Sequence, residues 1–306
     1  MPASASSDHR PPTDRPHAER WELTELLHGR TVADPYRWLE DAADPHTVRW
    51  AGEQDALART VLDALPGREG LRERLSRLLA TGSVGAPAVR GERLFHTRRE
   101  PGQEHSVLLV QEPDGTRRAL VDPGAIDPAG TTTLDGWVPS IEGERLAYLL
   151  STGGDEESRL YVLDVATGEL IEGPIDRCRY SAISWLPGSE QLFYVRRRPA
   201  HELPAGEESF HRRVYRHIVG ADPEHDVEVH GAGLDPTNYY DVRVSRDGRW
   251  LIVSASAGTA PRDDVWIADL DDDGDLRPVQ VGQDARCAAW IGHDGRLWLF
   301  TDRDAP

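Results

Sequence analysis

The sequence predicts a mainly β protein, in which a β-propeller over residues 81–306 follows a short helical segment. The first supporting observation is a repeated unit, in which a glycine turn precedes a charged or polar residue and an apolar strand. It begins at Gly91, Gly143, Gly188, Gly248 and Gly295, which lie 52, 45, 60 and 47 residues apart. A second unit, an alternating strand followed by a polar turn and another strand, falls between the first units at residues 106–110, 159–163, 214–218 and 264–268. Together they give about four strands per 45–55 residues, as in propeller blades. A general all-β sandwich is the alternative, but its turns would not alternate in this way.

Residues 1–20 are predicted to be a disordered tail, because they are rich in Pro, Ser, Asp and Arg and contain no apolar run. The same lack of an apolar run indicates that there is no signal peptide. No stretch of the chain approaches the ~18 apolar residues of a membrane span. We therefore expect a cytoplasmic protein without a membrane partner.

Residues 21–80 are predicted to be a helical segment. Asp44 and Pro45 form a good helix start, because Asp caps free N–H groups and Pro fits the first turn. This helix is expected to run to about Leu65, and a second one from about Glu69 to Leu79, with leucines on one face. Two helices this short cannot form a core of their own, so they need a further surface to pack on.

The number of repeats predicts four complete blades and the first half of a fifth. The strand at residues 297–300 is followed by only six residues, where a second hairpin would normally begin. An open ring leaves unpaired strand edges. We therefore expect the sequence to be a fragment or a truncated gene product.

The charge of the chain argues against nucleic-acid and anionic-lipid partners. Its formal net charge is -18, and all its basic residues are arginines. The run Arg196-Arg197-Arg198 is interpreted as a solvated face and not as a nucleic-acid site.

No metal and no cofactor is predicted. Cys178 and Cys287 lie far apart and form no CxxC, which favours buried free thiols over a disulfide or a zinc site. Residues 269–274 match the start of a calcium loop, but position twelve of that pattern is Gln280 and not the bidentate Glu. We interpret this stretch as an acidic turn.

The stretch Asp34-Pro-Tyr-Arg-Trp-Leu-Glu-Asp41 closely resembles the N-terminal signature of the prolyl oligopeptidase family of serine peptidases. The resemblance extends over residues 21–306. It implies a seven-bladed propeller inserted between the helical segment and a C-terminal α/β-hydrolase domain, which the helical segment completes. Tyr36, Trp38 and Leu39 are then expected to dock this segment onto the rest of the enzyme. Oligopeptidases that cut after basic residues have a looser version of the signature and are the second choice.

No catalytic residue is assigned in this chain. The pattern Gly-x-Ser-x-Gly, in which a strained turn exposes a nucleophile, does not occur. The nearest string, Ser254-Ala-Ser256-Ala-Gly258, lacks the first glycine and follows a blade strand. The resemblance therefore implies that the triad lies in the C-terminal domain and that these 306 residues alone are inactive.

The resemblance also implies a substrate pocket on the propeller. Tyr180 falls where the family has an aromatic residue that flanks the bound peptide. Tyr239 and Thr259 lie near two other pocket positions, where this sequence departs in residue type. The alternative for Tyr180 is that it packs the inner strand of a blade.

Two functions remain open. The first is the N-terminal and propeller portion of a serine endopeptidase that cleaves short peptides after proline, with the propeller filtering its substrates. The second is a non-catalytic propeller that serves as a binding scaffold, because fold alone does not fix function. The helical segment favours the peptidase, since a scaffold has no need of it.

Overall fold

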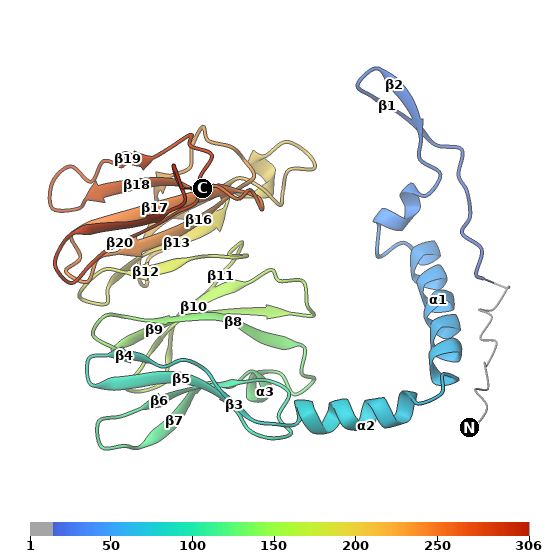
Figure 1. Ribbon diagram of the computed structural model, residues 1–306, viewed down its shortest axis with the longest axis horizontal. Helices are drawn as coiled ribbons and strands as arrows, with labels where there is room; N and C mark the ends of the chain where they lie inside the picture. The colour runs from blue at the N-terminus through green and yellow to red at the C-terminus, as the bar shows by residue number, and fades with distance from the viewer. Residues whose placement is uncertain (1–14, 306) are drawn as a thin grey trace. The chain divides into compact units, whose positions relative to one another are not determined.

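The computed structural model describes residues 15–305 and divides the chain into two compact units, between Ala80 and Thr81 (Figure 1). We call residues 15–80 the arm and residues 81–305 the propeller. Of the predicted disordered tail, residues 1–14 lie outside the described residues. Its described part, residues 15–20, packs within the arm, where the carbonyl of Glu19 accepts a hydrogen bond from the Trp38 indole (3.0 Å).

The arm begins with a hairpin that is not among the predicted elements. Strands β1 (Thr24–Leu27) and β2 (Arg30–Ala33) pair antiparallel around His28 and Gly29, which both have left-handed φ angles of 50° and 77°. Two such residues form the tight turn that suits the twist of a two-residue hairpin. The usual Asn-Gly or Asp-Gly signal is missing here, so the sequence pattern did not reveal the turn.

The two predicted helices are present. After a short 3-10 helix η1 (Arg37–Glu40), α1 spans Pro45–Asp63 and α2 spans Arg68–Leu79. The Asp44 side chain caps α1 by accepting a hydrogen bond from the His46 amide (2.7 Å). Neither helix contains a buried residue, and the leucines of α2 are exposed. The apolar face of α2 is therefore unused within the arm.

The residues 34–41 have a structural role inside the arm itself. Trp38 is buried, and its ring centroid lies 6.4 Å from that of Trp21 and 6.1 Å from that of Trp50. Arg37 forms ion pairs with Asp34 and with Glu25 of the hairpin. Trp38 is thus buried by Trp21 and Trp50 within the arm, and the docking of this segment onto the rest of the enzyme stays a prediction.

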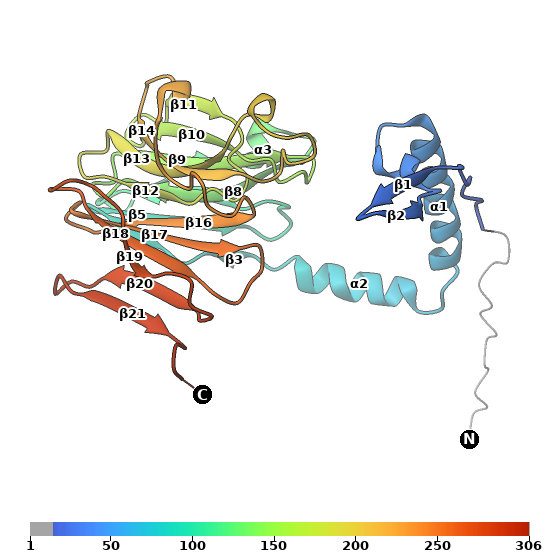
Figure 2. The same ribbon diagram turned by 90° about the horizontal axis from the view of Figure 1, so that it is seen from above.

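The propeller consists of antiparallel sheets in which successive strands are neighbours, which confirms the predicted mainly β propeller fold (Figures 1 and 2). Blade 1 contains β3 (Ser83–Val84), β4 (Ala88–Arg90), β5 (Arg93–Arg99), β6 (Val107–Gln111) and β7 (Arg117–Val121). Blade 2 contains β8 (Thr132–Pro139), β9 (Arg145–Thr152), β10 (Arg159–Asp164) and β11 (Leu170–Ile175). Blade 3 contains β12 (Ile183–Trp185), β13 (Gln191–Arg197), β14 (Arg212–Ile218) and β15 (Val227–His230). Blade 4 contains β16 (Asn238–Val244), β17 (Trp250–Ala257), β18 (Asp264–Asp269) and β19 (Arg277–Gln280). The hairpin of β20 (Cys287–Ile291) and β21 (Leu297–Thr301) begins the fifth sheet.

Three short helices lie in the connections between the strands. They are α3 (Pro123–Ile126) and the 3-10 helices η2 (Ala200–Glu202) and η3 (Pro223–His225). The glycine-turn unit of the sequence produces the second strand of the sheets in blades 2, 3 and 4 and of the fifth sheet (β9, β13, β17 and β21), and the third strand of blade 1 (β5). The repeat in the sequence is therefore the repeat of the blades.

The hydrophobic core of the propeller lies between successive blades. Four clusters of buried side chains occupy the four blade interfaces, represented by Phe95 with Leu146, Leu149 with Tyr194, Val214 with Tyr240, and Ile252 with Cys287. On β9, Leu146 and Leu150 face blade 1, whereas Ala147 and Leu149 face blade 3. Successive side chains of a strand point to opposite faces of its sheet, and both faces of β9 are buried. Cys178 and Cys287 are buried free thiols in these clusters, as predicted.

Arginine side chains join the same interfaces at the glycine turns. Arg93 donates to the Gly143 carbonyl in blade 2 (2.9 Å), and Arg145 of blade 2 donates to the Ser189 carbonyl in blade 3 (2.8 Å). The two arginines occupy the same place in the Gly-Glu-Arg repeat. One side chain of the repeat thus connects each of these blades to the next.

A buried histidine joins blades 2 and 3. His217 on β14 is fully buried, with its Nδ1 2.7 Å from the Asp226 carboxylate and its Nε2 2.9 Å from the Glu172 carboxylate of β11. Burial lowers the pKa of His217, but the hydrogen bonds and negative charges of Asp226 and Glu172 outweigh it and raise the pKa to about 9. The imidazole is therefore charged at neutral pH and bridges two carboxylates.

This bridge predicts that the stability of the chain falls at alkaline pH. Because the folded pKa of His217 lies above the ordinary value of 6.5, its contribution is complete below pH 6.5 and disappears as the pH rises through 9. The loss is up to about 3 kcal/mol in the free energy of unfolding. Urea unfolding at about five pH values between 6 and 10 measures this loss in the free energy of unfolding.

The matched variants are His217→Gln and, as a control, His201→Gln, whose side chain is exposed. We expect His217→Gln to remove the decline that sets in above pH 6.5 and His201→Gln to preserve it. A decline of the same size in His217→Gln contradicts the bridge.

Candidate functional site

Two of the three predicted pocket residues lie together on the propeller. Tyr180 precedes β12 and Tyr239 lies at the start of β16, so they come from adjacent blades, and their ring centroids are 5.9 Å apart. Tyr180 is 52% exposed and Tyr239 38% exposed. The alternative that Tyr180 only packs an inner strand does not hold, because half of its surface is open.

Thr259 lies in the turn after β17 and is exposed. The Gly258 amide of this turn donates to the Thr237 carbonyl at 3.2 Å. Thr237 is two residues before Tyr239, so the backbone holds the turn beside the start of β16. The structure thus places Thr259 near the strand that carries Tyr239.

Blade 2 fixes the position of Tyr180. Its hydroxyl donates to the Glu156 carboxylate, which also pairs with Arg179 (2.6 Å). The Arg179 guanidinium lies 5.1 Å from the centre of the Tyr180 ring, in cation–π geometry. Tyr180 itself has a left-handed φ of 56°, an uncommon conformation for a bulky residue. These contacts turn the ring out of the blade and towards Tyr239.

The two tyrosines lie where the innermost strands begin. The opposite ends of these strands surround a hollow of about 610 Å³, lined by residues that include Arg90, Pro139, Trp185, Val244 and His293. Five sheets contribute to it, so it marks the axis around which the blades are arranged. The tyrosine pair therefore lies at the other end of the innermost strands.

Several buried arginines lie on strands β13 and β14 of blade 3. Arg196 pairs with Glu224 (2.8 Å) and Asp176, Arg197 with Glu157, and Arg213 with Glu228 (3.3 Å). The interpretation of Arg196 and Arg197 as a solvated face is wrong, because acidic residues distant in sequence neutralise them and allow them to be buried.

Arg212 differs from these arginines. It is 2% exposed, and no ion pair to it is found among the residues that the structure describes. Its guanidinium lies 4.0 Å from the centre of the Tyr239 ring, and one NH group donates to the Ser209 carbonyl (3.3 Å). Within the described part of the chain its Nε has no hydrogen-bond partner, which is also true of the Nε of Arg197 and Arg213, so the difference lies in the missing carboxylate. Burial lowers the pKa of Arg212, and the positive charges of Arg197 and Arg179 add to this effect. The structure thus holds a buried cation without a carboxylate partner beside Tyr239.

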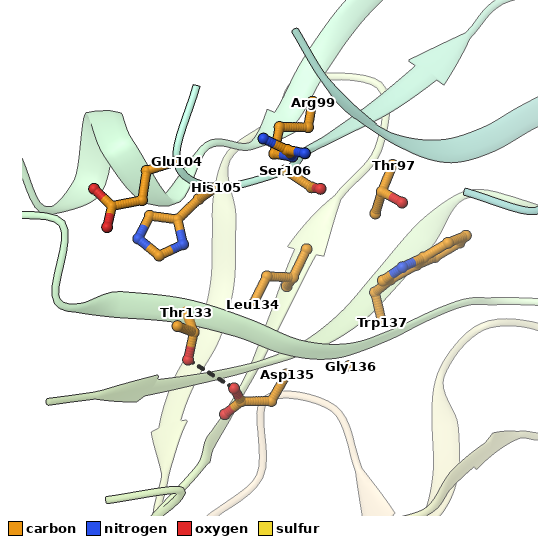
Figure 3. Close-up of a pocket in the computed structure, with 10 residues that line it drawn as sticks. All are labelled: Thr97, Arg99, Glu104, His105, Ser106, Thr133, Leu134, Asp135, Gly136 and Trp137. Carbon is orange, nitrogen blue, oxygen red and sulfur yellow. Dashed lines mark hydrogen bonds between the residues drawn. The ribbon is translucent and has the colours of Figure 1, made fainter. Parts of the chain in front are cut away.

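A second hollow, of about 670 Å³, lies between blades 1 and 2 (Figure 3). Several of its polar side chains have partners within the protein. Asp135 accepts from the hydroxyls of Thr133 (2.8 Å) and Ser158 (2.7 Å), and His105 lies 2.9 Å from the Gly130 carbonyl. Figure 3 shows the Ser106 hydroxyl pointing away from the His105 ring, so these two are not arranged as nucleophile and base. No sequence pattern predicted this hollow.

The remaining candidate residues from the sequence make hydrogen bonds and ion pairs within the blades. The Ser256 hydroxyl donates to the Ala260 carbonyl (3.0 Å), within a strand and turn and not at a nucleophile elbow. Asp269 accepts from Arg249 (2.7 Å) and from a backbone amide. Within residues 15–305, no group of His, Cys, Asp and Glu is positioned to hold a metal ion. In that same part of the chain, neither long helix is apolar enough to cross a membrane.

Comparison with known proteins gives a consistent result. Residues 16–306 match the family model described as "Prolyl oligopeptidase, N-terminal beta-propeller domain". The prolyl endopeptidase of Elizabethkingia meningoseptica is 29% identical over 293 residues, which are 95% of this chain and 41% of that protein. The prolyl endopeptidase of Elizabethkingia miricola is 27% identical over 310 residues, which are 99% of this chain and 43% of that protein.

Solved structures agree with the sequence comparisons. One from a study of two prolyl endopeptidases superposes with a TM-score of 0.85 at 31% identity, over 96% of this chain and 43% of that chain. Prolyl oligopeptidase B from Galerina marginata, bound to a 35mer hydrolysis and macrocyclization substrate, shares the fold, with a TM-score of 0.79 at 22% identity over 96% of this chain and 45% of that chain. The chain spans about two fifths of the length of the curated relatives described above.

Because Arg196 has carboxylate partners and Arg212 has none among residues 15–305, we expect their replacement to change the stability of the chain differently. Arg212→Met removes a buried charge that has no carboxylate partner, so we expect the free energy of unfolding to stay the same or to rise. Arg196→Met breaks hydrogen bonds to charged groups, and we expect a loss of about 1–3 kcal/mol. Urea unfolding of the two variants measures the difference, and a loss in Arg212→Met as large as that in Arg196→Met contradicts it.

Proposed function

Because the chain belongs to the prolyl oligopeptidase family, through that family's N-terminal β-propeller domain, we propose that it is the N-terminal and propeller portion of a serine endopeptidase that cleaves short peptides after proline. The observation that carries the proposal is the match over residues 16–306, which includes the arm as well as the blades. The curated relatives described above are prolyl endopeptidases, which supports cleavage after proline over cleavage after basic residues.

The substrate-binding part of the proposal is assigned to Tyr180, Tyr239 and Thr259. Two half-exposed aromatic rings at 5.9 Å offer an apolar surface for the ring of a proline or for a neighbouring apolar side chain. Proline has no N–H group, so its recognition relies on shape and apolar contact more than on backbone hydrogen bonds. Glu156 supports this role by holding Tyr180 in place.

The chemical step is assigned to groups outside these residues. Peptide cleavage proceeds by attack of a serine, with a histidine as general base, an aspartate that orients it, and backbone N–H groups that stabilise the oxyanion. The proposed place of these groups is a C-terminal α/β-hydrolase domain. In this proposal the propeller limits access to that domain, admits short peptides, and acts in the cytoplasm without nucleic-acid partners.

The arm favours this proposal over a non-catalytic scaffold. Helix α2 exposes Leu71, Leu75 and Leu78 along one face, and neither α1 nor α2 contains a buried residue. An apolar stripe of this kind normally packs against another surface. A scaffold that used only the blades would have no role for it.

We expect the 306-residue chain alone to show no peptidase activity. Loss of triad residues from a serine hydrolase lowers turnover by ~10^4–10^6. A chromogenic glycyl-prolyl substrate provides the assay, and turnover that a serine-directed inhibitor abolishes would contradict the assignment.

We also expect Tyr180→Ala to weaken binding of a proline-containing peptide to the chain by about tenfold, because the loss of one aromatic contact costs roughly 0.5–1.5 kcal/mol beyond its buried area. Titration calorimetry measures the dissociation constant. Tyr36→Ala in the arm, also at an exposed tyrosine, is the control and should leave binding unchanged. Equal affinity of the Tyr180→Ala variant and the unmodified chain counts against the proposed pocket.

A further inference from the structure

We propose that Arg212 binds a carboxylate of the peptide that lies on Tyr180 and Tyr239, so that the propeller recognises acidic peptides as well as proline. This inference rests on the proposed function, because it takes the tyrosine pair as the place where a peptide binds. The carboxylate belongs either to an acidic side chain or to a free C-terminus.

The first argument is the charge balance around the tyrosines. Arg179 is neutralised by Glu156 and Arg197 by Glu157, whereas no carboxylate among the described residues pairs with Arg212. This group of residues therefore carries one excess positive charge, although the whole chain has a net charge of -18. In such an acidic chain a buried cation without a partner is unexpected.

The second argument is energetic. Removing a guanidinium from water without a carboxylate partner destabilises the folded chain. The Nε of Arg212 is buried and has no hydrogen-bond partner, and the cation–π contact with Tyr239 compensates only in part. An incoming carboxylate would supply both the missing charge and the missing acceptor. The planar guanidinium suits it, because it can donate two parallel hydrogen bonds to one carboxylate.

The third argument is position. The Arg212 guanidinium lies 4.0 Å from the centre of the Tyr239 ring, and that ring lies 5.9 Å from the Tyr180 ring. A peptide on the tyrosines is therefore next to the guanidinium. Tyr239 covers Arg212 and is itself 38% exposed, so a shift of this ring opens the guanidinium to the carboxylate.

Three peptides with one Gly-Pro core and an acetylated N-terminus test the inference. The first has a glutamate side chain and a C-terminal amide, the second a glutamine and a free C-terminal carboxylate, and the third a glutamine and a C-terminal amide. Titration calorimetry against the full 306-residue chain gives three dissociation constants. We expect one of the two acidic peptides to bind at least about tenfold tighter than the neutral one, as expected for one charge-assisted hydrogen bond, and that peptide identifies the source of the carboxylate.

Two variants separate recognition from general electrostatics. Arg212→Met should remove the preference for the carboxylate and leave the neutral peptide unaffected. Arg216→Met is the matched control on the same strand, because Arg216 is exposed and donates to Gln191, and it should retain the preference. A preference lost equally in both variants overturns the inference, and so does an Arg212→Met variant that unfolds as easily as Arg196→Met.

The remaining outcomes distinguish this inference from the proposed function. If all three peptides bind with equal affinity, the inference is wrong and the peptide site on the tyrosines stands. If none binds, both the carboxylate site and the peptide site are wrong.

Discussion

The face-to-face packing of successive blades is the constraint on which the rest of the propeller depends. Blades 2, 3 and 4 each have two apolar faces, and each of these faces is buried by a neighbouring sheet. Burial of one large apolar side chain contributes about 1.5–3 kcal/mol, so the four clusters outweigh any single polar contact. A blade on its own would expose both faces, and the repeats therefore stabilise one another as in other repeat architectures.

Polar side chains at these interfaces connect neighbouring blades in a defined orientation. The candidate site also lies at a blade interface and is held by the same kind of polar contact. Arg93, Arg145 and His217 each connect one blade to the next through defined acceptors. The tyrosine pair lies across the interface of blades 3 and 4, and Glu156 of blade 2 holds one of its members. Arg212 lies in the same region but has no carboxylate partner among the residues that the structure describes. We therefore explain its presence by binding of a ligand and not by a contribution to the stability of the fold.

The sequence predicted the features that depend on local pattern. The glycine-turn repeats predicted one central strand of each blade, and Asp44 and Pro45 predicted the start of α1. The family resemblance indicated Tyr180 and Tyr239, which the structure places side by side, and their role in binding stays a prediction. The burial of Arg196 and Arg197 could not be predicted in the same way, because their partners Asp176 and Glu157 lie 20 and 40 residues away. Arg212 was not predicted because its importance lies in the lack of a partner, which only a three-dimensional structure reveals. The β1–β2 hairpin was missed because His28-Gly29 is a weak turn signal.

The central claim is that peptides bind on the tyrosine pair of blades 3 and 4. Hydroxyl-radical footprinting of the chain, with and without a proline-containing peptide, tests it most directly, because exposed tyrosines are readily oxidised and mass spectrometry locates each modified residue. Binding on the tyrosine pair predicts that the peptide protects Tyr180 and Tyr239, while the exposed Tyr36 of the arm is oxidised to the same extent in both samples. Unchanged oxidation of Tyr180 and Tyr239 at a peptide concentration that saturates binding would contradict it.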